Sequence, residues 1–134
     1  MVGFPTETYD DFLKTLEIMR YVKYDNIYSF IYSRRSGTKA ALMEDAATAE
    51  ERGEWFREML ALQRSIADES YKRFLGREFT VLFDGTSRRE GFISGKSDEF
   101  IITEAKGDSS LIGTMHRVRV TKTMSWAVEG EIID

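Results

Sequence analysis

The sequence lacks cysteine altogether and contains only one proline, Pro5, and one histidine, His116. Without cysteine the chain can form no disulfide, no thiolate zinc site and no cysteine-bound iron–sulfur cluster, and it has no thiol nucleophile. A lone histidine, with no second histidine or cysteine beside it, does not indicate a transition-metal site. We therefore expect no metal or cofactor to be held by this chain alone.

Long hydrophobic runs and a strong excess of one charge are also missing. No apolar run approaches the roughly 18 residues that span a bilayer, and residues 1–5 lack the basic region and apolar core of a signal peptide. We therefore expect a cytoplasmic location and no membrane partner. The formal net charge is −4, so a nucleic-acid-binding surface has to come from the placement of basic side chains rather than from their total.

A first helix and a first strand are predicted near the start of the chain. Thr8 is a typical N-cap residue, and apolar residues recur after it at helical spacing, which predicts a helix over 9–23. Residues 27–32 form a continuous aromatic and β-branched run. Such a run is typical of a buried strand.

A second, longer helix follows. Thr48 and Glu51 have the spacing of a capping box, and the apolar stripe after them predicts a helix over 49–74. Gly76 is a plausible stop for this helix. The stripe that contains Trp55 is typical of helix packing, with a face toward a partner as the alternative.

The pattern changes after Gly76, where residues alternate between polar and apolar. Phe79, Val81 and Phe83 share one face of a predicted strand. Turn residues separate five short runs, which is typical of a small closed or nearly closed barrel. The predicted strands are 77–83, 89–94, 100–105, 116–122 and 126–133.

These elements predict an α+β fold with two parts. Residues 1–73 are interpreted as a partial, TIM-like β/α segment with a long connecting helix, because a strand–helix–strand–helix unit is typical of a parallel α/β sheet. So few parallel strands cannot cover both of their faces, so this segment looks like the middle of a larger barrel. Residues 74–134 are predicted to form a five-stranded antiparallel OB-like barrel.

Several motifs, in order along nearly the whole chain, resemble those of the MiaB-type radical-SAM tRNA methylthiotransferases. Residues 2–8 are similar to the family's VGFPGET segment and residues 30–41 to its FIYSPREGTPAA stretch. The LALQ of residues 60–63 resembles part of its connecting helix. Three further segments resemble its terminal TRAM domain: Leu111-Ile112-Gly113, 118–121 (VRVT) and 125–130 (SWAVEG).

This resemblance implies a parent enzyme that uses a [4Fe–4S] cluster and S-adenosylmethionine to add a methylthio group to an adenosine of tRNA. The cluster ligands would lie before Met1, so this chain is expected to be inactive by itself. Residues 1–73 would then complete the radical-SAM barrel, and the TRAM barrel would bind and position the anticodon arm. Departures include Thr6 and Arg34, which replace a glycine and a proline of the family pattern.

Two groups of candidate site residues follow. The resemblance places the first near S-adenosylmethionine in the parent; a plain strand-to-helix turn and a solvated loop charge are the alternatives. The second group supplies most of the positive charge of the barrel and is able to neutralise RNA phosphates, with ordinary surface charge as the alternative because acidic residues are interleaved. The first group is Gly3, Phe4, Glu7 and Arg35; the second is Arg88, Arg89, Lys96, Arg117, Arg119 and Lys122.

The aromatic residues near these cations, Phe92, Phe100 and Trp126, are expected mainly in the core, and they stack on bases only if they are exposed. The favoured function is therefore a tRNA-binding module of a methylthiotransferase. The alternative is a structural fragment without RNA binding, which forms homo-oligomers through an exposed barrel edge and the Trp55 face.

Overall fold

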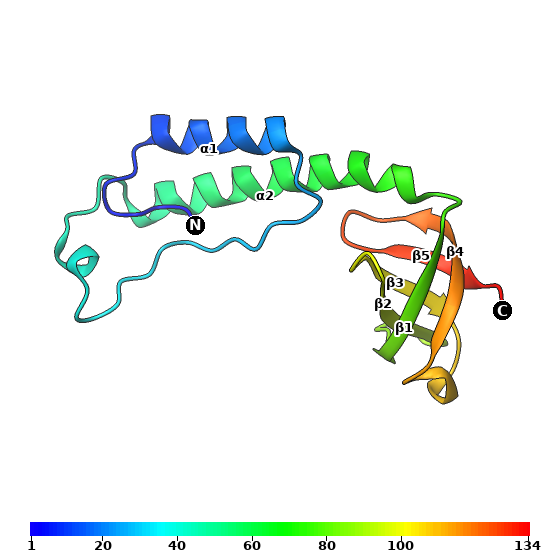
Figure 1. The fold of residues 1–134 in the computed structure, drawn as a ribbon. Coiled ribbons are helices and arrows are strands. Elements are labelled where there is room, and N and C mark those ends of the chain that lie inside the picture. Colours follow the sequence, from blue (N-terminus) through cyan, green and yellow to red (C-terminus); the bar gives the residue numbers. More distant parts are fainter. The chain divides into compact units, whose positions relative to one another are not determined.

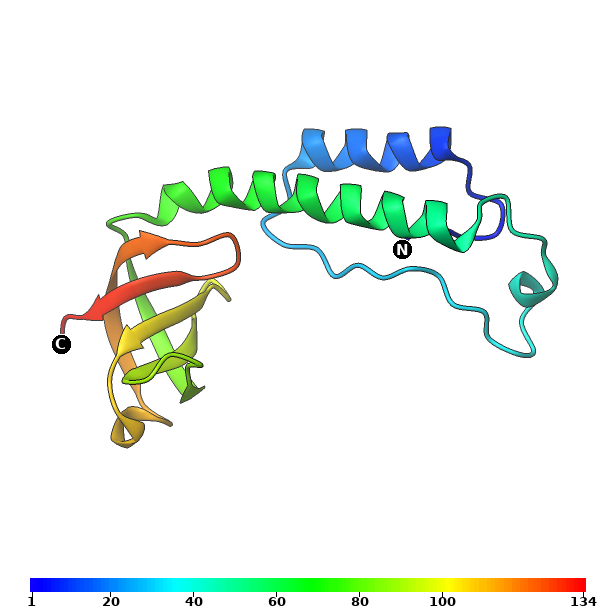
Figure 2. The same cartoon turned by 180° about the vertical axis from the view of Figure 1, so that it is seen from behind.

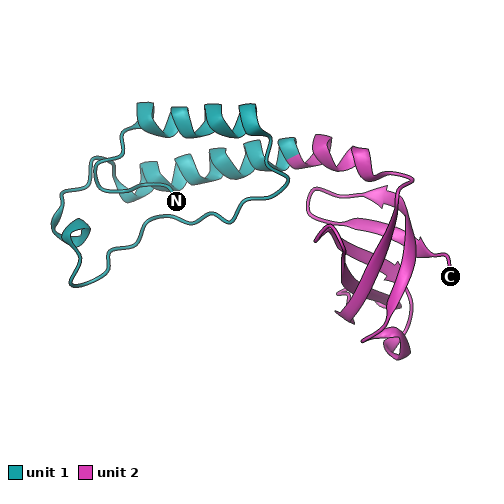
Figure 3. Cartoon of the chain, viewed as in Figure 1, with its two compact units in different colours: residues 1–66 teal, residues 67–134 magenta.

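The computed structural model describes all residues from 1 to 134, and they form two compact units, Met1–Ile66 and Ala67–Asp134 (Figure 3). The division falls inside the long helix, earlier than the boundary expected after residue 73. The elements, seen from two sides in Figures 1 and 2, are α1 (Tyr9–Val22), η1 (Lys39–Leu42), α2 (Ala49–Tyr71), η2 (Lys72–Phe74), β1 (Glu78–Thr86), β2 (Phe92–Ser97), β3 (Ile102–Lys106), η3 (Ser109–Leu111), β4 (Met115–Thr123) and β5 (Val128–Ile132).

Both predicted helices form, and their starting residues explain where they begin. The Thr8 side chain accepts a hydrogen bond from the Asp11 backbone N–H, and the Asp11 carboxylate accepts one from the Thr8 backbone N–H, which completes a capping box. At α2, Glu51 N donates to Thr48 Oγ1 at 3.2 Å and Thr48 N donates to Glu51 Oε2 at 2.7 Å. These bonds satisfy backbone donors that a helix N-terminus otherwise leaves unpaired.

In the first unit, α1 lies alongside the first part of α2 (Figure 1), and their facing side chains form one core. Phe12 and Leu16 are fully buried, and Phe12 stacks on Trp55 with ring centroids 5.6 Å apart. Burial of each such side chain contributes about 1.5–3 kcal/mol. The core also includes Val2, Met19, Ala47 and Met59.

The buried strand predicted over residues 27–32 is wrong. This segment is extended but makes only one parallel bridge, between Ile31 and Val2, and Tyr28 and Phe30 are 95% and 59% exposed. Aromatic and β-branched residues favour a strand only where neighbouring strands pair with it and other elements cover it. In this chain the backbone around Val2 is the one neighbour that pairs with it.

The second unit is a closed barrel in the order β1-β2-β3-β5-β4. The predicted α+β class and five-stranded barrel are confirmed. The expected antiparallel pairing holds for four of the strand pairs but not for the fifth, because β3 and β5 pair in parallel and complete the closure. The core contains the expected alternating set Phe79, Val81 and Phe83, each at most 3% exposed.

Candidate nucleic-acid interface

A depression with a volume of about 510 Å³ lies on the second unit. Two loops border it: the β1–β2 loop, residues 87–91, and the β4–β5 loop, residues 124–127. Ser94 of β2 and Glu104 of β3 also line it. These two residues face outward and lie side by side, because they are partners in the β2–β3 register. The complete lining is Thr86, Ser87, Arg88, Arg89, Ser94, Glu104, Met124 and Trp126.

The exposed aromatic residues were not expected from the sequence. Trp126 is 53% exposed in the β4–β5 loop and Phe100 is 84% exposed, so the expectation that both pack in the core is wrong. Trp126 precedes β5 instead of belonging to it, and therefore escapes the inward–outward alternation of the strand. Phe92 is half-buried, under the guanidinium of Arg89, 3.8 Å from the ring centroid.

Three of the six candidate RNA-binding cations are held by carboxylates of the barrel. Arg89 Nη1 lies 2.5 Å from Glu129 Oε2, and this hydrogen bond raises the pKa of Arg89 above its usual range. Arg117 and Arg119 share one face of β4, as predicted, and both bind Glu78 of β1. The hydrogen bond from Arg119 is the main cause that lowers the pKa of Glu78.

The other three cations are Arg88, Lys96 and Lys122. All three are exposed and have no carboxylate within ion-pair distance. Arg88 lies in the depression itself, and Lys96 projects from β2 beside β1 and β3. These side chains are able to approach a phosphate without first breaking an ion pair. The structure therefore divides the basic set into a paired half and an unpaired half.

A carboxylate that the sequence did not single out as a site residue lies within the depression. Glu104 is 6% exposed and is the one charged residue among the buried residues. Ser87 Oγ donates a hydrogen bond to Glu104 Oε1 at 2.8 Å. Its glutamate type and outward position in the strand pattern were readable from sequence, but its burial by the two loops was not.

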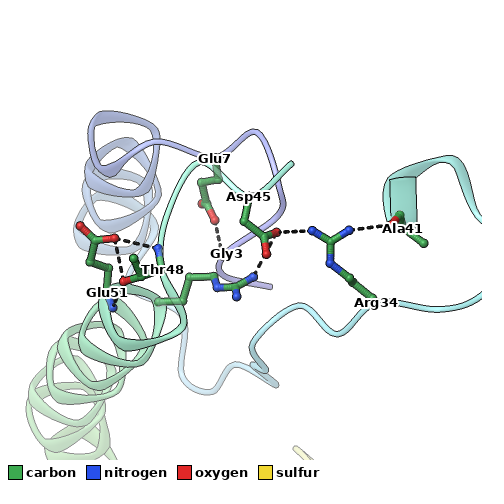
Figure 4. A network of polar contacts seen from close by, with 8 residues as sticks. Gly3, Glu7, Arg34, Ala41, Asp45, Thr48 and Glu51 are labelled. Atoms are coloured by element: carbon green, nitrogen blue, oxygen red, sulfur yellow. Dashed lines mark hydrogen bonds and ion pairs between the residues drawn. The ribbon is translucent and has the colours of Figure 1, made fainter. Parts of the chain in front are cut away.

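The candidate residues of the first unit form no single site. Gly3 N donates a hydrogen bond to the Glu7 carboxylate across a tight turn (Figure 4), in which Gly3 has φ +77°. Phe4 packs edge-on against Tyr32, with ring centroids 5.4 Å apart. Arg35 instead lines a separate depression of about 340 Å³, and Gly3, Phe4 and Glu7 are not part of that lining.

Arg34, which precedes Arg35 in the chain, makes polar contacts with other residues of the first unit. Its guanidinium donates to Ala41 O at 2.6 Å and lies 3.1 Å from Asp45 Oδ1 (Figure 4). Asp45 also pairs with Arg52 of α2 at 3.4 Å. Arg34 therefore anchors the loop to the start of α2, whereas Arg35 is exposed and makes no such ion pair.

The residues of this chain do not fit an iron–sulfur cluster, because the sequence has no thiolate to offer one. No group of three metal-ligating side chains occurs either. His116 is held between Thr114 and Asp134, with contacts of 3.0 Å on each side. The backbone N–H of Arg117, and then His116, lower the pKa of Asp134.

The two surfaces expected to support homo-oligomers are not exposed. Trp55 is 7% exposed and packs between Phe12 and Tyr9, and the barrel is closed, so it has no free strand edge. The interpretation of the Trp55 stripe as helix packing is confirmed. The alternative of an exposed Trp55 face and an exposed barrel edge is wrong, because the side chain and the strands find their partners within their own units. Neither α1 nor α2 combines the length and apolarity needed to cross a membrane.

Comparison with known proteins identifies similar sequences over the whole chain. The chain is 39% identical to the tRNA-2-methylthio-N(6)-dimethylallyladenosine synthase of Acetivibrio thermocellus, over 99% of its own length and 28% of that protein's. It is 38% identical to the synthase of the same name from Geotalea uraniireducens, over 98% of its own length and 30% of that protein's. It is 34% identical to the synthase of Francisella tularensis subsp. novicida, over 99% of its own length and 30% of that protein's.

No protein-family model matches the chain. The chain spans about 30% of the length of the curated relatives that it matches. The motif resemblance and the whole-chain identities agree on the same enzymes, and a match of this extent is consistent with their C-terminal part. Over its whole length, this chain therefore corresponds to a part of the MiaB-type tRNA methylthiotransferases.

Proposed function

We propose that the barrel of Ala67–Asp134 binds RNA and that, in the longer protein, it positions the anticodon arm of tRNA for methylthiolation of an adenosine. The observation that carries this proposal is the depression in which exposed Trp126 lies with unpaired Arg88. An exposed indole provides a stacking surface for a base, and a free guanidinium provides a partner for the adjoining phosphate.

The position of the depression supports the same function. OB-like barrels bind oligonucleotides on the face of strands 2 and 3, between the loop that joins strands 1 and 2 and the loop that joins strands 4 and 5. The depression of this barrel is lined by residues of those two strands and those two loops. Stacking of one base on an aromatic side chain contributes about 1–3 kcal/mol.

The methylthio transfer itself is assigned to the rest of the parent enzyme. The relatives are named as synthases of a methylthiolated tRNA nucleoside, and their family uses a [4Fe–4S] cluster and S-adenosylmethionine. The present chain has no cysteine to ligate such a cluster. Its proposed contribution is substrate binding, and we place its activity in the cytoplasm with the tRNA.

A titration of labelled tRNA with the full chain, followed by fluorescence anisotropy at about 50 and 200 mM salt, tests this proposal. Binding should weaken at the higher salt concentration, because each phosphate contact releases counterions. The Lys96→Gln variant should bind more weakly and with a shallower salt dependence. Absence of salt-dependent binding would remove the RNA-binding role.

A second candidate function, self-association without RNA binding, is favoured by the apolar surface of the first unit. Tyr28 and Phe30, two residues apart in the same extended segment, are 95% and 59% exposed, and neighbouring exposed apolar side chains are a feature of interaction surfaces. Light scattering across a range of protein concentrations separates the two candidates. A concentration-independent monomer that binds tRNA would reject self-association as the function.

A further inference from the structure

Glu104 has an unusual position for a residue in an RNA-binding depression. Its side chain is 8% exposed, and a buried carboxylate is costly unless donors surround it. Ser87 Oγ supplies one donor, to Oε1. Arg89 Nη1 lies 3.7 Å from Oε2, which is too far for a direct hydrogen bond. Oε2 is therefore left with an ion-pair partner but no hydrogen-bond donor.

This carboxylate restricts what the depression is able to accept. A phosphate placed against Glu104 would meet a like charge in a poorly solvated position, which is unfavourable. A cationic ligand would meet Arg88 and Arg89, which line the same depression. A neutral, flat group that carries hydrogen-bond donors avoids both repulsions, because it can stack on Trp126 and donate to Glu104.

We propose that the depression binds one unpaired guanine base of an RNA. In this arrangement the base stacks on Trp126, its N1–H and N2–H₂ groups donate to the Glu104 carboxylate, and Arg88 pairs with the neighbouring phosphate. The proposal deepens the RNA-binding function proposed above and rests on it. It names the base that the site prefers.

The choice of guanine follows from the edges of the four RNA bases. An ionised carboxylate only accepts hydrogen bonds. Guanine presents two adjacent donors on its Watson–Crick edge, whereas adenine and cytosine each place one donor beside an acceptor. Uracil places a single donor between two carbonyl oxygens, which would face the carboxylate unfavourably. Unpaired bases are read on this edge when they are splayed out of a single strand.

The test uses short oligouridylates in which one central nucleotide is replaced by guanosine, adenosine or cytidine. Binding of each oligonucleotide to the full chain is measured by fluorescence anisotropy at one low salt concentration. The guanosine oligonucleotide should bind roughly tenfold more tightly than plain oligouridylate. Adenosine and cytidine should fall between the two. Equal affinity for all four would overturn the proposal while leaving the RNA-binding function intact.

Matched variants assign the preference to Glu104. Glu104→Gln should reduce the guanosine preference to about twofold or less, because the amide replaces one acceptor with a donor. Glu90→Gln removes the same charge from the β1–β2 loop at a residue outside the depression, and should keep the preference. Trp126→Phe should retain base selectivity, and Trp126→Ala should weaken binding of all four oligonucleotides.

Two further results are decisive, and a folding control accompanies them. An unchanged guanosine preference in Glu104→Gln would overturn the role of this carboxylate. Circular-dichroism melting checks that each variant is folded, and if Glu104→Gln is not, the base series on the unaltered chain decides the proposal. Absence of binding to every oligonucleotide and to tRNA would instead be a failure of the proposed RNA-binding function.

Discussion

Arg89 of the β1–β2 loop pairs with Glu129 of β5, with Nη1 and Oε2 2.5 Å apart. The same guanidinium covers the ring of Phe92. One side chain thus ties a loop to a strand that is distant in sequence. Arg88, the preceding residue, makes no ion pair and faces the depression.

This contrast predicts that substitutions of the two adjacent arginines change different properties, the stability of the barrel in one case and RNA binding in the other. Arg89→Ala should lower the melting temperature of the barrel, because it removes an ion pair and a cation–π contact. Arg88→Ala should leave the melting temperature unchanged and weaken RNA binding instead. Thermal denaturation followed by circular dichroism, combined with anisotropy titrations, measures both effects. Equal loss of stability in the two variants would contradict the assignment.

The paired and unpaired cations should differ in their contribution to the salt dependence of RNA binding. Lys96→Gln and Lys122→Gln should each weaken tRNA binding and reduce the salt slope by about 1. Arg117→Gln and Arg119→Gln should change the slope less, because both side chains are already paired with Glu78. Plots of log affinity against log salt concentration give each slope. Indistinguishable slopes for all four variants would contradict this division.

Gly95 of β2 is predicted to be required by the close approach of β1. A Cβ atom at this position would clash with the backbone of Leu82 and Phe83, which cannot move as a flexible side chain can. Gly95→Ala should therefore destabilise the barrel by about 1–3 kcal/mol. Gly85→Ala is the matched control, because its added Cβ has open space. Urea unfolding of both variants provides the comparison.

The start of α1 should be sensitive to acid. Hydrogen bonds from Thr8, followed by the contact with Lys14, lower the pKa of Asp11 from 3.8 to about 2. Because the folded-state pKa is depressed, this stabilisation is fully present above the unfolded value and is lost as the pH falls through about 2. Asp11→Asn should remove this part of the acid dependence. Helicity measured during acid titration of both proteins tests this prediction.

Local sequence patterns determined the helices and most of the barrel strands. Thr8, Thr48 and Glu51 mark helix starts through hydrogen bonds to residues only three positions away. The alternation of Phe79, Val81 and Phe83 likewise reports one buried strand face. Such features depend on backbone geometry over a few residues, so they are readable without knowledge of the fold.

The tertiary structure alone decided which of these residues are able to meet a ligand. Parallel pairing of β3 with β5 closes the barrel and places Glu104 beside Glu129, and folding of two loops brings Arg88 and Trp126 to one depression. For residues 27–32, the β-forming sequence gains only one bridge because a strand also needs neighbours. Pairing, burial and access depend on contacts between distant segments, and no local pattern contains that information.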